Sequence, residues 1–192
     1  LDAIAPYSST PLRIVLANRW LTAPLVRRQL LASPESAASI RTTATTTILQ
    51  AGTKDNVLPQ HARAVVNHRI LPGDTIDSVL AHDRRAAGDP RIQLRALSGA
   101  RNPSKPAATT GAEYQRVAVA IRATFPHAAV APGLIVGASD GRHYEGLARA
   151  VLRFAPYTLG KDDLARLHGN NERIAIADYM RAIAFYERLI SG

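Results

Sequence analysis

The chain has 192 residues, a hydrophobic fraction of 46% and no cysteine, which predicts a globular protein with one large domain or two small ones. No stretch approaches the roughly 18 apolar residues of a membrane-spanning helix, so no membrane partner is predicted. Without cysteine, disulfides and thiolate metal sites are excluded. Histidine, aspartate and glutamate are then the strong metal ligands that the chain can offer.

The chain is basic, with 24 lysine and arginine residues against 15 aspartate and glutamate residues and a formal charge of +9. The arginines are scattered in "VRRQ", "DRRA" and "ARAVL", without the interleaved aromatic residues typical of single-stranded nucleic-acid sites. The charge therefore indicates mainly a solvated surface, and no nucleic acid is predicted as a partner.

The first forty residues predict a helical lead-in. Segment 11–40 is apolar and helix-prone, and Pro24 interrupts it. Its apolar side chains need another part of the protein to pack against. We therefore treat residues 1–40 as a separate helical segment.

Residues 41–100 predict a small sandwich of strands and one helix. β-branched residues from Thr43 to Gly52 favour a strand, which "TKDNVLPQ" ends. The alternation in "ARAVVNHRIL" predicts a second strand, with one largely apolar face formed by Ala64, Val66, His68 and Ile70. Asp74 is expected to cap a helix that stops at Gly88, and "RIQLRAL" predicts a third strand. This order is common in two-layer α+β sandwiches.

The glycine- and proline-rich stretch 99–111 predicts a boundary, after which residues 101–192 form a second domain. Apolar residues at helical spacing predict a helix that carries Tyr114, Val117, Ile121 and Phe125. Strands are predicted within 130–136 and 148–156, although the alanines of the second segment also permit a helix. A short helix is predicted in "KDDLARL". The last helix is expected to bury one apolar stripe, formed by Tyr179, Ile183, Tyr186 and Ile190. This alternation indicates part of an α/β sheet domain, and the small number of strands in both halves predicts a fragment.

His168 has two interpretations on local sequence. It follows the "DDLARL" helix, where a charged imidazole interacts favourably with the helix dipole, and spacing alone favours this role as a helix cap. A metal-ligand role needs partners. Asp140 and His143 in "SDGRHY" are the nearest candidates, and they lack a recognised ligand spacing.

The loop "VGASDGRHY" also has two interpretations. Its glycines could let backbone N–H groups near Ala138 and Ser139 approach a carboxylate or an oxyanion. The alternative is an ordinary tight turn in which Asp140 bonds its own backbone. No nucleophile elbow surrounds Ser139, so it is a poor candidate nucleophile.

Arg69 projects from the polar face of its predicted strand. A guanidinium there could hold a carboxylate in a two-pronged geometry, and the alternative is a solvated arginine. His61 and His68 are interpreted as structural residues.

Read together, "AGTKDNVLPQHARAVVNHRILPGDT", "GASDGRHY" and "LHGNNERI" resemble a known family in their order and spacing. This is the zinc-dependent family of acetylornithine deacetylase, succinyl-diaminopimelate desuccinylase and carboxypeptidase S, and most closely the branch that includes N-acyl-amino-acid hydrolases. The resemblance covers nearly the whole chain. It implies an incomplete lid, or dimerisation, α/β sandwich at 41–100, followed at 101–192 by the C-terminal part of an α/β zinc-peptidase catalytic domain.

The resemblance also implies roles for individual residues. His168 matches the family's final metal ligand, which favours the ligand role over the helix cap. Asn56 and Arg69 match lid positions that bind the substrate's carboxylate or amide. Ala138 and Ser139 match positions whose backbone contacts the substrate, although the alanine departs from the residue usual in the family. Asp140 and Arg142 match residues that hold this loop in shape.

The family's remaining zinc ligands, its general base and a histidine of the first lid strand have no counterpart in this chain. Amide hydrolysis by this route needs a metal-bound water with a lowered pKa, a carboxylate that takes its proton, and stabilisation of the oxyanion. One histidine supplies none of these in full. The prediction is therefore a C-terminal part of a two-zinc hydrolase that cleaves an amide next to a free carboxylate, in a peptide or an N-acyl amino acid. The chain alone is expected to bind zinc weakly or not at all, to be inactive, and to form a homodimer through the lid. The alternative is a non-catalytic dimerisation or binding module.

Overall fold

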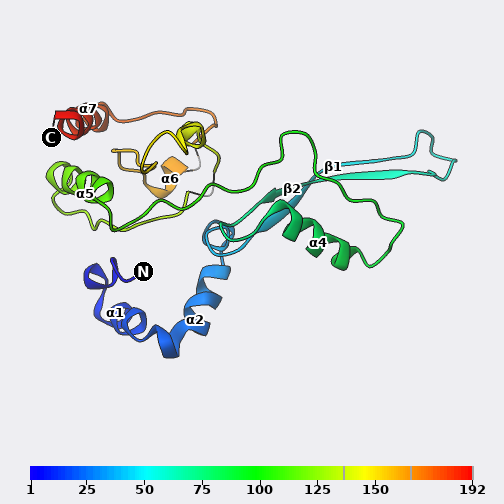
Figure 1. Ribbon diagram of the computed structural model, residues 1–192, viewed down its shortest axis with the longest axis horizontal. Coiled ribbons are helices and arrows are strands. Elements are labelled where there is room, and N and C mark those ends of the chain that lie inside the picture. Colours follow the sequence, from blue (N-terminus) through cyan, green and yellow to red (C-terminus); the bar gives the residue numbers. More distant parts are fainter. Residues whose placement is uncertain (136, 165, 192) are drawn as a thin grey trace. The chain divides into compact units, whose positions relative to one another are not determined.

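The computed structural model describes residues 1–135, 137–164 and 166–191. The chain divides into two compact units. Figure 1 labels the helices and strands. The hairpin unit comprises residues 19–106 and 134–138, and the helix-pair unit comprises residues 1–18, 107–133 and 139–192. The change of unit after residue 106 falls within the stretch 99–111.

The hairpin unit contains an antiparallel pair of strands, β1 (Thr43–Ala51) and β2 (Ala62–Arg69). Thr43 pairs with Arg69 at one end and Ala51 pairs with Ala62 at the other, with a register shift between Thr46 and Ile48. The prediction of both strands is confirmed. Their β-branched and alternating residues suit a pleated ladder.

Helix α4 (Ile76–Ala87) follows the hairpin, as predicted, and ends at Gly88. Gly88 has φ 64°, a left-handed conformation that glycine adopts without steric cost. The expected cap was wrong by one residue, because the Thr75 hydroxyl accepts the Ser78 N–H and closes a capping box. Asp74 instead accepts a hydrogen bond from the Thr42 hydroxyl.

A contact between a histidine and an aspartate joins strand β2 to helix α4. His68 Nε2 lies 3.0 Å from Asp83 Oδ2, and the His68 side chain is 16% exposed. Val79, one helical turn before Asp83 in α4, is buried. The structural interpretation of His68 agrees with this contact, whereas His61 lies exposed in the connection between the strands.

Three further strands were predicted wrongly. Residues 92–97 and 130–135 adopt no regular structure, and Val136 lies outside the described residues. Within 148–156, Ala148 forms an isolated bridge with Glu145 and the rest is irregular. An extended segment becomes a strand only when a neighbour completes its ladder of hydrogen bonds. Among the described residues, that neighbour exists only for β1 and β2.

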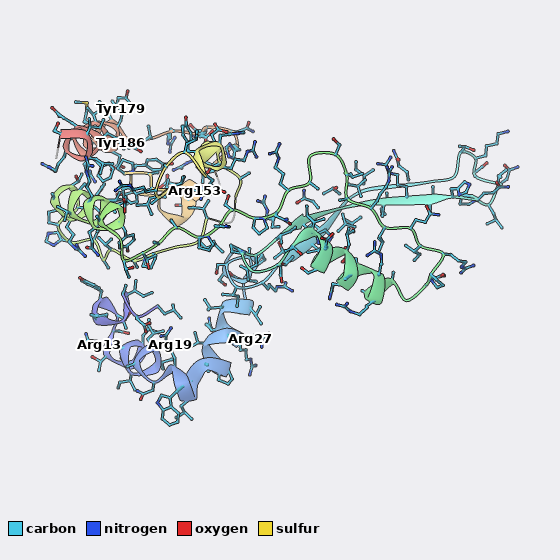
Figure 2. The ribbon with its side chains drawn as sticks, viewed as in Figure 1. Arg13, Arg19, Arg27, Arg153, Tyr179 and Tyr186 are labelled. Carbon is cyan, nitrogen blue, oxygen red and sulfur yellow. The ribbon has the colours of Figure 1, made fainter. Side chains whose placement is uncertain are left out.

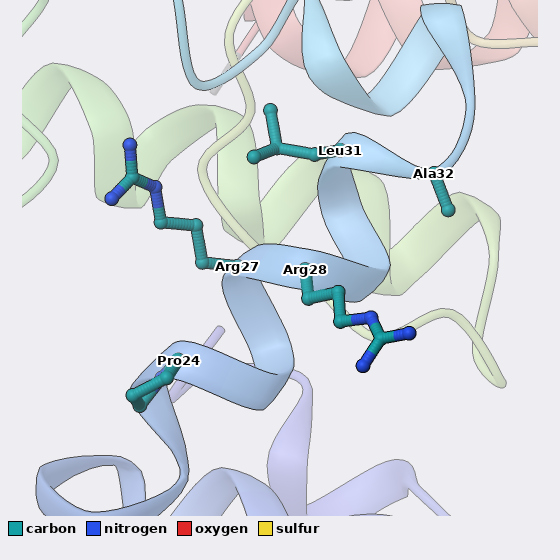
Figure 3. Close-up of a pocket in the computed structure, with 5 residues that line it drawn as sticks. All are labelled: Pro24, Arg27, Arg28, Leu31 and Ala32. Atoms are coloured by element: carbon teal, nitrogen blue, oxygen red, sulfur yellow. The ribbon is translucent and has the colours of Figure 1, made fainter.

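The lead-in segment is helical, as expected. It forms a 3-10 turn, η1 (Ala5–Tyr7), and three helices, α1 (Thr10–Ala17), α2 (Arg19–Leu31) and α3 (Pro34–Ala37). Pro24 lies inside α2 and does not end it. Figure 3 shows the shallow depression on α2 that Pro24, Arg27, Arg28, Leu31 and Ala32 line.

The helix-pair unit is built around α5 (Ala112–Thr124) and α7 (Ile176–Ser191). Its core contains Ala120 and Ile121 of α5 and Phe185 of α7, which is 1% exposed. Polar bonds also join the two helices: Arg116 Nη2 donates to the Leu189 carbonyl at 3.0 Å. The helix predicted before Pro126 is confirmed, and its expected apolar stripe is buried or half-buried.

The predicted buried stripe of α7 was wrong. Its members are exposed at 57%, 46%, 45% and 79% for Tyr179, Ile183, Tyr186 and Ile190. The helix buries Phe185 and half-buries Leu189 instead, and Figure 2 shows the labelled Tyr179 and Tyr186 on α7. Because α7 carries apolar residues on more than one face, periodicity alone did not identify the face that meets α5.

Two short helical elements complete this unit, η2 (Asp140–Tyr144) and α6 (Lys161–Leu164). The fold is thus mixed α and β, with one two-stranded sheet among the described residues. No helix in the described part of the chain is long and apolar enough to cross a membrane.

Candidate functional site

His168 lies exposed on a turn, not at a helix end. Helix α6 ends at Leu164, four positions earlier, so the helix-cap interpretation has no structural basis. The Gly169 N–H donates to the Arg166 carbonyl at 2.9 Å and closes the turn beneath the imidazole-bearing residue. His168 is therefore presented to its surroundings by a tight loop.

This turn carries unusual backbone conformations. His168 has φ 58° and Asn171 has φ 62°, and these are the two non-glycine residues with positive φ in the described ranges. Such conformations cost on the order of 1 kcal/mol or more each and cluster at functional sites. Both residues belong to "HGNN", residues 168–171.

Asp163 holds the base of the turn. One carboxylate oxygen accepts the Gly160 N–H at 2.8 Å, and the other accepts a hydrogen bond from the Arg166 guanidinium. These two bonds, the Gly160 N–H first, lower the pKa of Asp163. The carboxylate thus ties the start of α6 to the residue that opens the turn.

Among the residues that the structure describes, His168 does not belong to a preformed metal site. No group of three histidine, aspartate or glutamate side chains gathers there closely enough to hold a metal ion. Asp140 and His143, the candidate partners considered from local sequence, both lie in η2. His143 Nε2 accepts a hydrogen bond from Arg142 Nε at 3.2 Å.

The loop that begins at Ser139 contains a contact that sequence reasoning missed. Arg153 Nε donates to Ser139 Oγ at 2.8 Å, and Arg153 Nη2 lies 3.0 Å from Glu145 Oε1. Arg153 sat in a predicted strand, and nothing in the local pattern indicated this role. Asp140 and Arg142 form the first turn of η2, within the loop that Arg153 contacts.

Asn56 and Arg69 lie at opposite ends of the hairpin. Asn56 is exposed in the connection between the strands, beyond the Ala51–Ala62 pair, and Arg69 is the last residue of β2. The seven residue steps of β2 span about 23 Å. These two side chains therefore cannot hold the same carboxylate within one chain.

The predicted site residues are divided between the two units. Asn56, Arg69 and the exposed Ala138 belong to the hairpin unit, whereas Ser139, Asp140, Arg142 and His168 belong to the helix-pair unit. Within the helix-pair unit, His168 and the Ser139 loop are each braced by an arginine–carboxylate contact.

Comparison with known proteins identifies related sequences. Residues 14–90 match the peptidase dimerisation domain of the M20 family. The chain is 35% identical over its whole length to a probable carboxypeptidase S-like 2 of Dictyostelium discoideum. It is 36% identical to the N-fatty-acyl-amino acid synthase/hydrolase PM20D1 of Homo sapiens over its whole length, and 37% identical to that of Xenopus tropicalis over 95% of its length.

The chain spans 37% of the Dictyostelium relative, 39% of the human relative and 36% of the frog relative. The match to the dimerisation domain begins at residue 14, so it includes most of the predicted lead-in as well as the hairpin and α4. No solved structure matches the chain significantly.

Proposed function

Because the chain belongs to the M20 family, with a peptidase dimerisation domain and carboxypeptidase S-like and N-acyl-amino-acid hydrolase relatives, we propose that it is the C-terminal part of a hydrolase. The whole enzyme would cleave an amide next to a free carboxylate, in a peptide or an N-acyl amino acid. The observation that carries this proposal is the exposed His168 on its left-handed turn. The chain by itself is proposed to be inactive.

The described residues can supply one ligand of a zinc site. His168 offers one exposed imidazole, a ligand that suits zinc, whereas a catalytic zinc usually has three protein ligands. We propose that His168 holds zinc together with ligands from the rest of the whole enzyme. The metal would supply Lewis acidity for amide hydrolysis. The role of this chain is to present the imidazole on a braced turn and to bind and orient the substrate.

The separation of Asn56 and Arg69 supports a homodimer. The polar end of an N-acyl amino acid is much shorter than the roughly 23 Å between the ends of β2. If both residues contact that polar end, one chain's Asn56 and Arg69 serve different active sites. Two copies of the chain are then required, which agrees with the match to a dimerisation domain.

Arg69→Ala in the full-length protein tests the substrate class. The substrates are N-lauroyl derivatives of a panel of amino acids and their amidated counterparts, which lack the carboxylate. We expect activity on the free acids alone. Because the guanidinium would make charge-assisted hydrogen bonds to the carboxylate, we expect the variant to raise KM about tenfold or more and to change kcat little.

Arg63→Ala provides the matched control, since Arg63 is an exposed arginine of the same strand. It should leave KM near the wild-type value. An unchanged KM in Arg69→Ala would support the solvated arginine instead, and equal activity on acids and amides would refute the substrate class.

A second candidate function is a non-catalytic dimerisation module. Among the described residues, β1 and β2 each have a single neighbour, and such free edges pair readily with another chain. For this function we expect the isolated chain to elute from gel filtration as a dimer at every concentration. Aggregation that grows with concentration would count against an independent module.

A further inference from the structure

We propose that Arg153 is a positioning residue that clamps both ends of η2 and thereby holds Ser139 in place for substrate. This inference rests on the proposed function. Ser139 is the residue before the first turn of η2 and Glu145 is the residue after its last turn. Arg153, labelled in Figure 2, contacts both of them through one guanidinium.

The clamp matters because η2 is weakly held by its own backbone. It is a five-residue 3-10 segment, a form with poorer hydrogen-bond geometry than an α-helix. Ser139 makes no side-chain capping bond, and the Arg142 N–H reaches the Ser139 carbonyl only at 3.3 Å. The Ser139 hydroxyl is engaged by Arg153 instead. The loop conformation therefore depends on a residue outside the loop.

Arg153 is well placed to act as a clamp because the next residue is anchored in the core. The Phe154 ring packs against the Phe185 ring with centroids 5.2 Å apart, and Phe185 is almost fully buried. The Phe154 carbonyl also accepts a hydrogen bond from Tyr186 Oη at 3.5 Å. The Arg153 side chain is 25% exposed, so its contact with Glu145 is partly shielded from water. The packed helix pair thus fixes the segment from which the guanidinium projects.

Gly141 provides the room that the clamp needs. A Cβ at this position would lie 3.1 Å from Arg153 Nε and 3.1 Å from Val151 Cγ1, closer than an ordinary van der Waals contact. Arg153 therefore lies in the space that a side chain at position 141 would need. This explains a glycine in "SDGRHY" without an anion-binding nest.

The consequence for function follows from the position of Ser139. In the proposed enzyme the Ser139 backbone contacts substrate, and a loop that samples several conformations presents that contact only part of the time. Loss of the clamp then weakens binding in proportion to the lost population. The chemical step itself, which does not involve Arg153, continues at its normal rate.

The test compares Arg153→Met with Arg149→Met in the full-length protein that carries this chain. Arg149 is an exposed arginine in the same segment, so each variant removes one positive charge. For Arg153→Met we expect the amide hydrogens of residues 140–147 to exchange at least about tenfold faster. With N-lauroyl amino acids we expect KM to rise about tenfold and kcat to stay within about twofold. Arg149→Met should match wild type in both measurements.

Two further variants separate positioning from general stability. Arg153→Lys keeps the charge but lacks the planar guanidinium, so its KM should lie between those of the wild type and Arg153→Met. Ser139→Ala removes one contact of the clamp, so its effect on KM should be less than additive with that of Arg153→Met. A global unfolding midpoint lowered in parallel with the KM effect would indicate a merely structural role and overturn the proposal.

Exchange at 140–147 no faster in Arg153→Met than in Arg149→Met would also overturn it. If the wild-type protein hydrolyses no N-acyl amino acid, the proposed function fails on its own. The exchange measurement then still decides the clamp, and the dissociation constants of wild type and Arg153→Met for N-lauroyl amino acids decide its role in binding.

Discussion

His168→Asn in the full-length protein is expected to lower the zinc content per molecule and to reduce turnover at least about a hundredfold, because it would remove the proposed metal ligand. Asparagine is the informative replacement, since it tolerates the left-handed backbone that His168 adopts at φ 58°. The loss then reports on the imidazole and not on backbone strain. Elemental mass spectrometry after equilibrium dialysis measures the zinc, and steady-state kinetics measure turnover.

His143→Asn is the control for this experiment. His143 is also exposed and belongs to the helix-pair unit, yet it lies in η2 and has no proposed ligand role. It should leave the zinc content unchanged. Zinc content at the wild-type level in His168→Asn would refute the ligand assignment.

Phe185→Ala is expected to lower the free energy of unfolding of the helix-pair unit by about 3 to 5 kcal/mol, which is the usual cost of removing a buried aromatic side chain. Phe185 is 1% exposed and packs between Ile121 of α5 and the Phe154 ring. Its loss removes the main apolar contact between α5 and α7. Urea unfolding followed by circular dichroism measures the change.

Met180→Ala on the same helix is the matched control, because its side chain is 58% exposed. It should change the free energy of unfolding by less than about 1 kcal/mol. A similar loss in both variants would show that Phe185 is not the centre of this core. It would also reopen the question of which face of α7 is buried.

The ligand role of His168 and the conformation of its turn rest on different observations. The ligand role is a proposal from the resemblance of the sequence motif, whereas the positive φ angles of His168 and Asn171 describe the backbone of the turn. Strain of this kind is retained where the surrounding structure enforces it. Here Asp163 and Arg166 provide that enforcement at the base of the turn.

Local patterns predicted the elements whose hydrogen bonds are local or join neighbours in sequence. Helices α4 and α5 followed from spacing and from Gly88, and the two strands of the hairpin followed from two β-prone runs on either side of a polar segment. The same reasoning failed for 92–97 and 130–135. Extended segments look alike in sequence whether or not a neighbouring strand is present.

Several features of the candidate site could not be predicted from the sequence. The contact of Arg153 with Ser139 joins residues 14 positions apart, and no periodicity connects them. The separation of Asn56 from Arg69 required the register of the hairpin. The cap of α4 differed from the expected one because Asp74 is held by Thr42, a residue far away in sequence.

By itself, the amino-acid sequence determined most of the helices, the two strands of the hairpin, the family resemblance and the residue types available for chemistry, because these depend on local composition and order. Only the tertiary structure decided which face of α7 meets α5, which residue caps α4, and which arginine braces the Ser139 loop. Each of these is a choice between local alternatives of similar energy. Contacts between residues distant in sequence make that choice.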